Sequence, residues 1–429
     1  MSEIRITRRA ALAGAGSAAM LALSSRLALA QEKRLRMFWW GSKERADRTY
    51  KANELYTARN ASTKIDGETL GWTDYWPRVA TQAAGRNLAD VLQMDYRYIF
   101  EYARRGALMP LDQFMGKALD IADFGAPSID CGKVDGKLYG INLGNNSVAM
   151  LTNVSAFEAA GLKAPKTGID WKEFSALCGE LTKAAKKDGF YGSMDAGGLE
   201  PNLETWLRQR GKGLYSDEGQ VAFSADDMGE WFAMWDAMRK AKACVPADVQ
   251  ALDKQNIETN PLTLGKAAVA FAHSNQLVGY QAVNPNKLAI DMYPTIGAGG
   301  KPGQYLKPSM LFSIAANSKN AEEAAKIINF YVKDPEGVKA VGVERGVPAS
   351  PAARNVVAAD LDELGKAMVN YIGMISDKIG PLPAPPPKGA GEIAFLLKKT
   401  NEEVGFGKAT AAEAGKKFHA DALAIIARG

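Results

Sequence analysis

The sequence has few of the residues that most often carry catalysis or bind metals. It contains two histidines and three cysteines among 429 residues. Cys131, Cys178 and Cys244 stand far apart with no C-x-x-C spacing, which excludes the common zinc and dithiol motifs. The patterns G-x-S-x-G, H-E-x-x-H and Walker A are also absent. We therefore expect no metal, no cofactor and no catalytic residues.

Three cysteines allow at most one disulfide. Cys178 falls on one helical stripe with Phe174, Leu177 and Leu181, which predicts a buried thiol. If any pair bridges, we expect it to be Cys131 with Cys244.

Long apolar runs are missing after the first thirty residues, so no later segment predicts a membrane span. Arg5, Arg8 and Arg9 precede a short apolar run over residues 10–23, and a small-residue site follows at Ala28-Leu29-Ala30. This order predicts a secretory signal peptide, cleaved after Ala30. The Arg8-Arg9 pair favours twin-arginine export. We therefore expect a periplasmic protein.

A strong charge of one sign is also lacking in the mature chain. Residues 1–30 hold four arginines and one glutamate, so their removal lowers the formal charge from +5 to +2. The basic balance comes mostly from the export signal. The sequence gives no support for a nucleic-acid partner.

Strand and helix patterns alternate from Leu35 onward, which predicts an α/β protein with a doubly wound, parallel sheet. The first pairs are strands over 35–40, 63–71 and 88–94, each followed by a helix, over 44–58, 74–84 and 96–108. A second α/β stretch follows, with a hairpin over 133–141, helices over 171–186, 203–210 and 226–243, strands over 267–273 and 310–316, helices over 320–333 and 410–427, and a proline-rich connector over 381–389.

Aromatic and polar residues stand where the first three predicted strands end. Parallel sheets bind ligands beyond the carboxyl ends of their strands, so Trp40, Trp72, Asp95, Tyr96 and Arg97 are expected to converge there. Neighbouring residues of a strand point to opposite faces. The adjacent Trp39 is therefore expected to pack under a helix, while Trp40 enters a cleft.

Four segments, in order along the chain, resemble a known family. These are residues 82–114, with "LADVLQMDYRYIF" and "GALMPLD", residues 135–174, with "AGLKAP" and "DWKEF", residues 262–276, with "LGKAAVAF", and residues 313–350, with "GVPAS". The chain resembles the type 1 extracellular solute-binding proteins of ABC sugar importers, which are maltose-binding-protein-like. Residues 270–273 and the loosely matching 60–71 depart from the family pattern.

The resemblance implies a two-lobed periplasmic binding protein fold of type II, joined by crossing strands near 143–145 and 293–295. Lobe I would take 31–143 with about 295–340, and lobe II 144–294 with about 341–429. It also implies a monomer that binds a carbohydrate, most simply a di- or oligosaccharide, closes like a Venus flytrap and delivers the solute to a membrane permease.

A sugar site needs flat aromatic faces and planar polar groups that bind hydroxyls. The strand ends supply part of the predicted set, and positions that match the family supply the rest. The substrate-binding candidates are Trp40, Glu44, Trp72, Asp95, Tyr96, Arg97, Asn145, Asn146, Glu200, Asn202, His273, Ser274, Asn275, Lys307, Ser309 and Arg345.

Other readings of the sequence stay open at this point. Arg97, Lys307 and Arg345 suit an acidic sugar or a sugar phosphate as the ligand. An exported polysaccharide-active enzyme is an alternative of a different class, because sequence alone does not exclude a catalytic carboxylate pair. Arg97 is also four residues before Glu101, a spacing typical of a surface ion pair on a helix.

Overall fold

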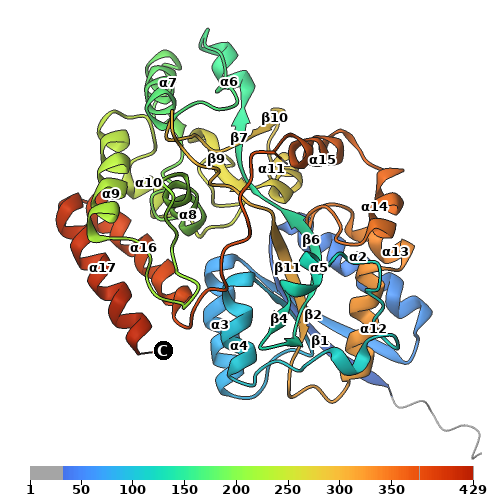
Figure 1. The fold of residues 1–429 in the computed structure, drawn as a ribbon. Coiled ribbons are helices and arrows are strands. Elements are labelled where there is room, and N and C mark those ends of the chain that lie inside the picture. Colours follow the sequence, from blue (N-terminus) through green and yellow to red (C-terminus); the bar gives the residue numbers. More distant parts are fainter. Residues whose placement is uncertain (1–31, 376, 429) are drawn as a thin grey trace, which may run out of the picture.

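The computed structural model describes residues 32–375 and 377–428 and shows a mixed α/β fold with two separate sheets (Figure 1). The proposed signal peptide, including the cleavage site after Ala30, lies outside the described residues. No helix in this part of the chain combines the length and the apolar character that a bilayer crossing requires.

The first sheet has five strands in the order β2-β1-β3-β11-β6. Its strands are β1 (Lys33–Trp40), β2 (Thr63–Leu70), β3 (Val91–Met94), β6 (Ile141–Asn146) and β11 (Lys307–Ile314). The three strands that alternate with helices, β1, β2 and β3, pair in parallel as predicted. The sheet is not wholly parallel, however, because β11 runs antiparallel to both β3 and β6.

Helices cover both faces of this sheet (Figure 1). One face carries α3 (Trp72–Ala84) and α4 (Tyr96–Arg104), and the other carries α2 (Lys43–Arg59), α12 (Ala321–Val332) and α13 (Pro335–Val341). Smaller elements of this half are η1 (Asp112–Phe114), α5 (Ala126–Asp130) and the hairpin of β4 (Lys133–Val134) and β5 (Lys137–Leu138), which turns at Asp135-Gly136 as predicted.

The second sheet has four strands in the order β10-β7-β9-β8. These are β7 (Val148–Asn153), β8 (Tyr191–Ser193), β9 (Ala267–His273) and β10 (Leu288–Asp291). The helices of this half are α6 (Val154–Ala159), α7 (Trp171–Ala184), α8 (Glu200–Gln209), α9 (Ala225–Lys240), α10 (Ala247–Gln250), η2 (Ser274–Gln276), α11 (Leu277–Val283), α14 (Pro351–Ala358), α15 (Glu363–Ile375), α16 (Ala390–Gly405) and α17 (Ala411–Ala427).

The two sheets have separate hydrophobic cores. One core gathers residues from Leu35 to Leu143 and from Met310 to Ala349, and the other gathers residues mostly from Val148 to Tyr293 and from Ala353 to Ile425. The chain passes from the first sheet to the second between β6 and β7, with only Ser147 between them. The molecule is therefore two-lobed, with each lobe built from separate stretches of sequence.

The cysteines are buried and free. Cys178 has no exposed surface, as predicted. Cys131 belongs to the core of the first sheet and Cys244 to the core of the second, so the suggested pairing of these two is wrong.

Trp39 packs under a helix, as expected. Its side chain is fully buried, and its ring meets the ring of Tyr50 on α2 edge to face at 5.2 Å between centroids. Trp39 therefore belongs to the core of the first lobe.

Replacing this ring by a methyl group should leave a large cavity in the core. We expect Trp39→Ala to lower the free energy of unfolding by about 3–5 kcal/mol in urea titrations. Phe406→Ala is the control, because Phe406 is 49% exposed and its loss should cost less than about 0.5 kcal/mol. Equal small losses for both variants would contradict the buried placement of Trp39.

Candidate functional site

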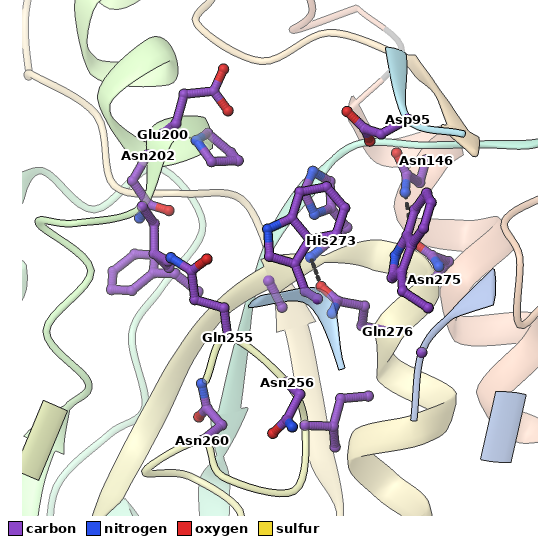
Figure 2. A pocket seen from close by; sticks show the side chains of 18 of the residues that line it. Asp95, Asn146, Glu200, Asn202, Gln255, Asn256, Asn260, His273, Asn275 and Gln276 are labelled. Carbon is purple, nitrogen blue, oxygen red and sulfur yellow. Dashed lines mark hydrogen bonds between the residues drawn. The ribbon is translucent and has the colours of Figure 1, made fainter. Parts of the chain in front are cut away.

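A cleft with about 1320 Å³ of unfilled space, open solvent included, lies between the two sheets (Figure 2). Residues of the first lobe line it from the ends of β1, β3 and β11, and residues of the second lobe line it from α8, β9 and the segment after α10. The cleft therefore lies where the sequence analysis expected it, beyond the carboxyl ends of the parallel strands.

Aromatic rings form one wall of the cleft. Trp40 ends β1, and its ring lies 5.1 Å from the ring of Trp72, the first residue of α3. Tyr98 on α4 lines the same wall and stacks on Trp76 at 3.6 Å. Trp40 is only 8% exposed, whereas Trp72 is half-buried. Trp72 therefore offers more of its surface to a bound molecule than Trp40 does.

Side-chain amides gather around the floor and the opposite wall. An amide provides two N–H donors and a carbonyl acceptor in one plane, which suits a ligand rich in hydroxyl groups. The amide residues that line the cleft are Asn146, Asn202, Gln255, Asn256, Asn260, Asn275 and Gln276, and all seven are labelled in Figure 2.

Two of the ion pairs in the cleft involve residues predicted for the site. Arg97 on α4 pairs with Glu200 at the start of α8, so this contact joins the two lobes. Lys307 at the start of β11 pairs with Asp95 at 3.2 Å. Burial raises the pKa of Asp95, but Lys307 and Arg97 outweigh that effect and hold the pKa below its ordinary value. Asp95 also accepts a hydrogen bond from the Arg97 N–H and so begins α4.

His273 ends β9 and lines the cleft. Its backbone N–H donates to Gln276 Oε1 at 2.8 Å, while the ring Nε2 is buried without a partner. Burial, with the positive charge of Lys307, lowers the pKa of His273 to about 3. His273 is thus neutral near pH 7, and its Nε2 is available for a hydrogen bond with a ligand.

Four buried polar atoms that belong to cleft residues have no hydrogen-bond partner. They are Arg97 Nε, Asn146 Oδ1, Asn202 Nδ2 and His273 Nε2. Such atoms are rare in folded proteins, because losing water without gaining a partner costs free energy. A ligand with hydroxyl or carboxyl groups in the cleft could satisfy all four.

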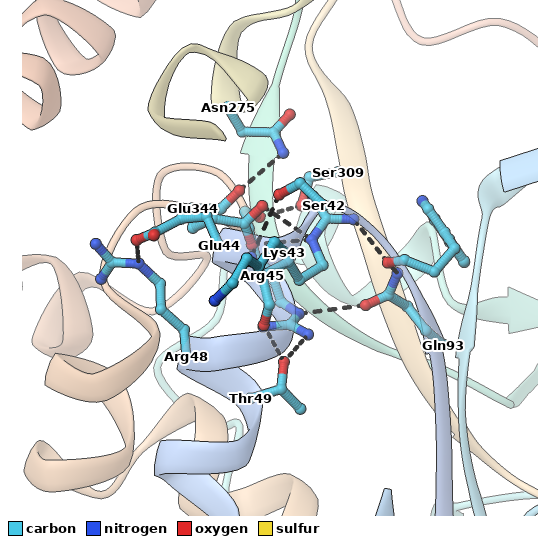
Figure 3. Close-up of polar contacts among 12 residues, drawn as sticks. Ser42, Lys43, Glu44, Arg45, Arg48, Thr49, Gln93, Asn275, Ser309 and Glu344 are labelled. Carbon is cyan, nitrogen blue, oxygen red and sulfur yellow. Dashed lines mark hydrogen bonds and ion pairs between the residues drawn. The ribbon is translucent and has the colours of Figure 1, made fainter. Parts of the chain in front are cut away.

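A buried ion pair joins Arg45, which lines the cleft, to Glu344 (Figure 3). Arg45 Nε lies 2.9 Å from both carboxylate oxygens of Glu344, and Arg45 Nη1 donates to the Trp40 carbonyl at 3.1 Å. The side chain of Asn275 donates to the Glu344 carbonyl at 2.9 Å. This chain of contacts fixes Trp40 of the first lobe relative to Asn275 of the second.

Most of the residues predicted for the site line the cleft. The structure brings together Trp40, Trp72, Asp95, Arg97, Asn146, Glu200, Asn202, His273, Asn275, Lys307 and Ser309. Tyr96 lies beside them but lines an adjoining cavity. Arg97 does not form the surface pair with Glu101, which instead accepts a hydrogen bond from Arg105.

Four predicted residues lie outside the lining of the cleft. Glu44 pairs with Arg48 along the surface of α2. Asn145 Oδ1 accepts from Asn142, and its backbone pairs with Val347. These polar groups are satisfied within the protein.

The remaining two are buried behind the cleft. Ser274 Oγ accepts from the backbone of Ser147 at 3.3 Å. Arg345 is 1% exposed and donates to Thr49 Oγ1 at 2.7 Å and to Gln93 Oε1 at 3.2 Å. In the structure Arg345 therefore bonds to β3 and α2 and does not line the cleft.

The sequence analysis missed two segments that line the cleft. One is the loop that carries Gln255, Asn256 and Asn260, and its polar run "DKQNIETN" is a signal that could have marked it. The other is α16, which contributes Phe395 and Lys398. Phe395 is 39% exposed, but no sequence pattern placed α16 near the cleft.

A family model for bacterial extracellular solute-binding proteins matches residues 51–365, which is more than half of the chain. The chain belongs to this family. The match includes most strands of both sheets and most of the cleft residues. Members of the family are substrate-binding proteins rather than enzymes. This finding argues against the alternative of an exported polysaccharide-active enzyme.

Individual relatives agree with this assignment. A protein of Brucella abortus (strain 2308) that carries the name of a binding protein is 25% identical over 295 residues, which is 66% of this chain and 67% of its own. A periplasmic oligogalacturonide-binding protein of Yersinia enterocolitica, solved with saturated digalacturonic acid, is 25% identical and has a TM-score of 0.83, covering 92% of this chain and 99% of its own.

A substrate-binding protein of Listeria monocytogenes, solved with cycloalternan, is 17% identical with a TM-score of 0.77 and covers 91% of this chain and 98% of its own. This likeness shows the shared fold. The chain is thus a two-lobed member of the bacterial extracellular solute-binding proteins.

The neutral, buried state of His273 predicts a pH dependence of stability. The unfolded chain gains a proton on this residue below about pH 6.5, whereas the folded chain does so only near pH 3. Stability should therefore fall as the pH drops below 6.5, by roughly 1.4 kcal/mol per pH unit from this group.

Urea unfolding at pH 6.5 and at pH 5 measures the effect. We expect the wild-type protein to lose about 2 kcal/mol more than His273→Gln over this interval. Asp95, Lys307 and Arg97 face His273 in both proteins, so their contributions should largely cancel. Parallel losses in the two proteins would contradict the assigned burial of His273.

Proposed function

We propose that the protein is the periplasmic substrate-binding protein of an ABC importer and that it binds a di- or oligosaccharide in the cleft between its lobes. The observation that carries this proposal is the combination of an aromatic wall with seven amide side chains and four unpartnered polar atoms. Sugar rings have apolar C–H faces and many hydroxyl groups, so they match both features. The saccharide bound by the Yersinia relative supports the same ligand class.

The eleven predicted residues that line the cleft are proposed as its ligand-binding residues. Trp72 and Trp40 would supply stacking faces. Asn146, Asn202 and His273 would supply hydrogen bonds through atoms that lack partners inside the protein.

Hinge closure is the proposed mechanism. We propose lobe I as 31–143 with about 295–340 and lobe II as 144–294 with about 341–429. A solute that bonds to both walls binds the closed form more tightly than the open form, so it shifts the equilibrium toward closure. The closed protein would then deliver its solute to the membrane permease. Export through the predicted twin-arginine signal peptide would place the monomeric protein in the periplasm.

An acidic sugar or sugar phosphate is a second candidate. Arg97 and Lys307 present cationic donors at one end of the cleft, beside the neutral ring of His273. Digalacturonic acid in the Yersinia relative favours the acidic class. The ion pairs with Glu200 and Asp95 offset both cations, however, so neutral saccharides suit the same groups.

A thermal-shift screen tests the function and separates the two candidates. Digalacturonic acid and galactobiose form a matched pair. Each ring of digalacturonic acid carries a carboxylate where the ring of galactobiose carries a hydroxymethyl group. Maltose, cellobiose and glucose 6-phosphate extend the screen. A ligand at 100 times its Kd should stabilise the folded protein by about 2.7 kcal/mol. Failure of every saccharide to raise the Tm would contradict the proposal.

The aromatic wall gives a more specific prediction. We expect Trp72→Ala to weaken binding of the best saccharide by about 1–3 kcal/mol, because a half-exposed stacking face is lost. Isothermal titration calorimetry measures the change. Trp39→Ala is the matched control, because Trp39 faces the core and not the cleft. The folded molecules of this variant should bind the saccharide with unchanged affinity. Equal affinity losses would remove Trp72 from the site.

A further inference from the structure

A second cavity, with about 1290 Å³ of unfilled space including open solvent, adjoins the cleft. The two share part of their walls, formed by Asp95, Arg97, Glu200, Pro201, His273 and Lys307. The cleft and this second chamber are therefore neighbouring parts of one hollow between the lobes.

The residues of the shared wall come from both lobes. Its central contact is the ion pair between Arg97 and Glu200, which come from different lobes. Arg97 Nε and His273 Nε2 are buried in this wall without partners. The wall therefore holds two polar atoms that could bond to a molecule beside the ion pair.

The second chamber has its own binding chemistry. Tyr96, Tyr215 and Tyr305 contribute aromatic rings and hydroxyl groups, and the guanidinium of Arg208 lies 4.9 Å from the Tyr305 ring centre. Tyr305 donates a hydrogen bond to the Glu204 carboxylate. Tyrosine rings together with carboxylates and cations are suited to the faces and the hydroxyl groups of sugars.

The proline-rich connector closes one side of the chamber. Residues 381–384 and Pro386 line it. Arg208 of the second lobe donates to the Pro381 carbonyl at 2.7 Å, and Tyr96 of the first lobe donates to the Pro383 carbonyl at 3.3 Å. The connector is thus held from both lobes, and Leu382 between these contacts stays 36% exposed.

We propose that the second chamber is a further subsite for the same solute, so that a saccharide of three or more residues extends from the cleft past Arg97 and Glu200. This inference rests on the proposed function and narrows its ligand class to longer chains. A separate small ligand fits the second chamber less well than an extended saccharide does, because the two cavities share six wall residues. The unpartnered atoms Arg97 Nε and His273 Nε2 also lie in this shared wall, where an extended ligand would pass.

Isothermal titration calorimetry with two length series tests the subsite on the mature protein. The series are mono- to tetragalacturonic acid and glucose to maltotetraose. For the series that binds, we expect the tetrasaccharide to bind at least about tenfold more tightly than the disaccharide, which corresponds to about 1.4 kcal/mol.

Leu382→Trp should block the chamber, because Leu382 lines the chamber and tryptophan is larger than leucine. The leucine side chain makes no hydrogen bond, so its replacement breaks none. In this variant the tetrasaccharide should lose its advantage, while the disaccharide keeps its affinity within about twofold. Leu423→Trp on α17 is the matched control, at 45% exposure and outside both cavities, and should bind like the wild type.

The outcomes separate the two proposals. Disaccharide binding with no gain for longer chains in the wild type, or a gain that survives in Leu382→Trp, would overturn the second subsite and leave the proposed function standing. An equal loss for all lengths in Leu382→Trp would also overturn the subsite. No binding of either series would overturn the second subsite, and a negative thermal-shift screen beside it would overturn the proposed function as well.

Discussion

The geometry of the cleft depends on the short crossing between the two sheets. β6 of the first sheet leads into β7 of the second through Ser147 alone. Beside this crossing Asn145 and Val347 exchange two backbone hydrogen bonds, at 2.8 and 2.9 Å. A Cβ atom at Gly144 would lie 2.7 Å from the Arg345 carbonyl oxygen. The two segments of the chain therefore approach too closely for any residue other than glycine at this position. This contact fixes where the lobes meet and lets their strand ends face each other.

Pairing of charges decides how the cleft can recognise a ligand. Arg45, Arg97 and Lys307 each contact a carboxylate, on Glu344, Glu200 and Asp95. A buried ion left alone would be costly, whereas a paired one is tolerated. Because the cations are already paired, the groups left for a ligand are mostly neutral amides, aromatic faces and single N–H donors. Recognition then depends on hydrogen-bond geometry and stacking more than on net charge.

The sequence predicted the local features of the fold well. The alternation of strands and helices and the opposite directions of Trp39 and Trp40 follow from periodicity, which neighbouring residues determine. Arg345 illustrates the limit of such reasoning, because its partners Thr49 and Gln93 lie far away in the chain. Likewise α16 lines the cleft only because the last segment folds back toward α4, a long-range contact that no local pattern encodes.

The ion pair between Arg97 and Glu200 links recognition to movement. It joins α4 of one lobe to α8 of the other, so it stabilises the arrangement in which the two walls are close. A ligand that only replaced this pair would gain little preference for the closed form, since one cross-lobe contact would be exchanged for another. The shift toward closure must therefore come from contacts the protein cannot make with itself, above all at the buried atoms that lack partners.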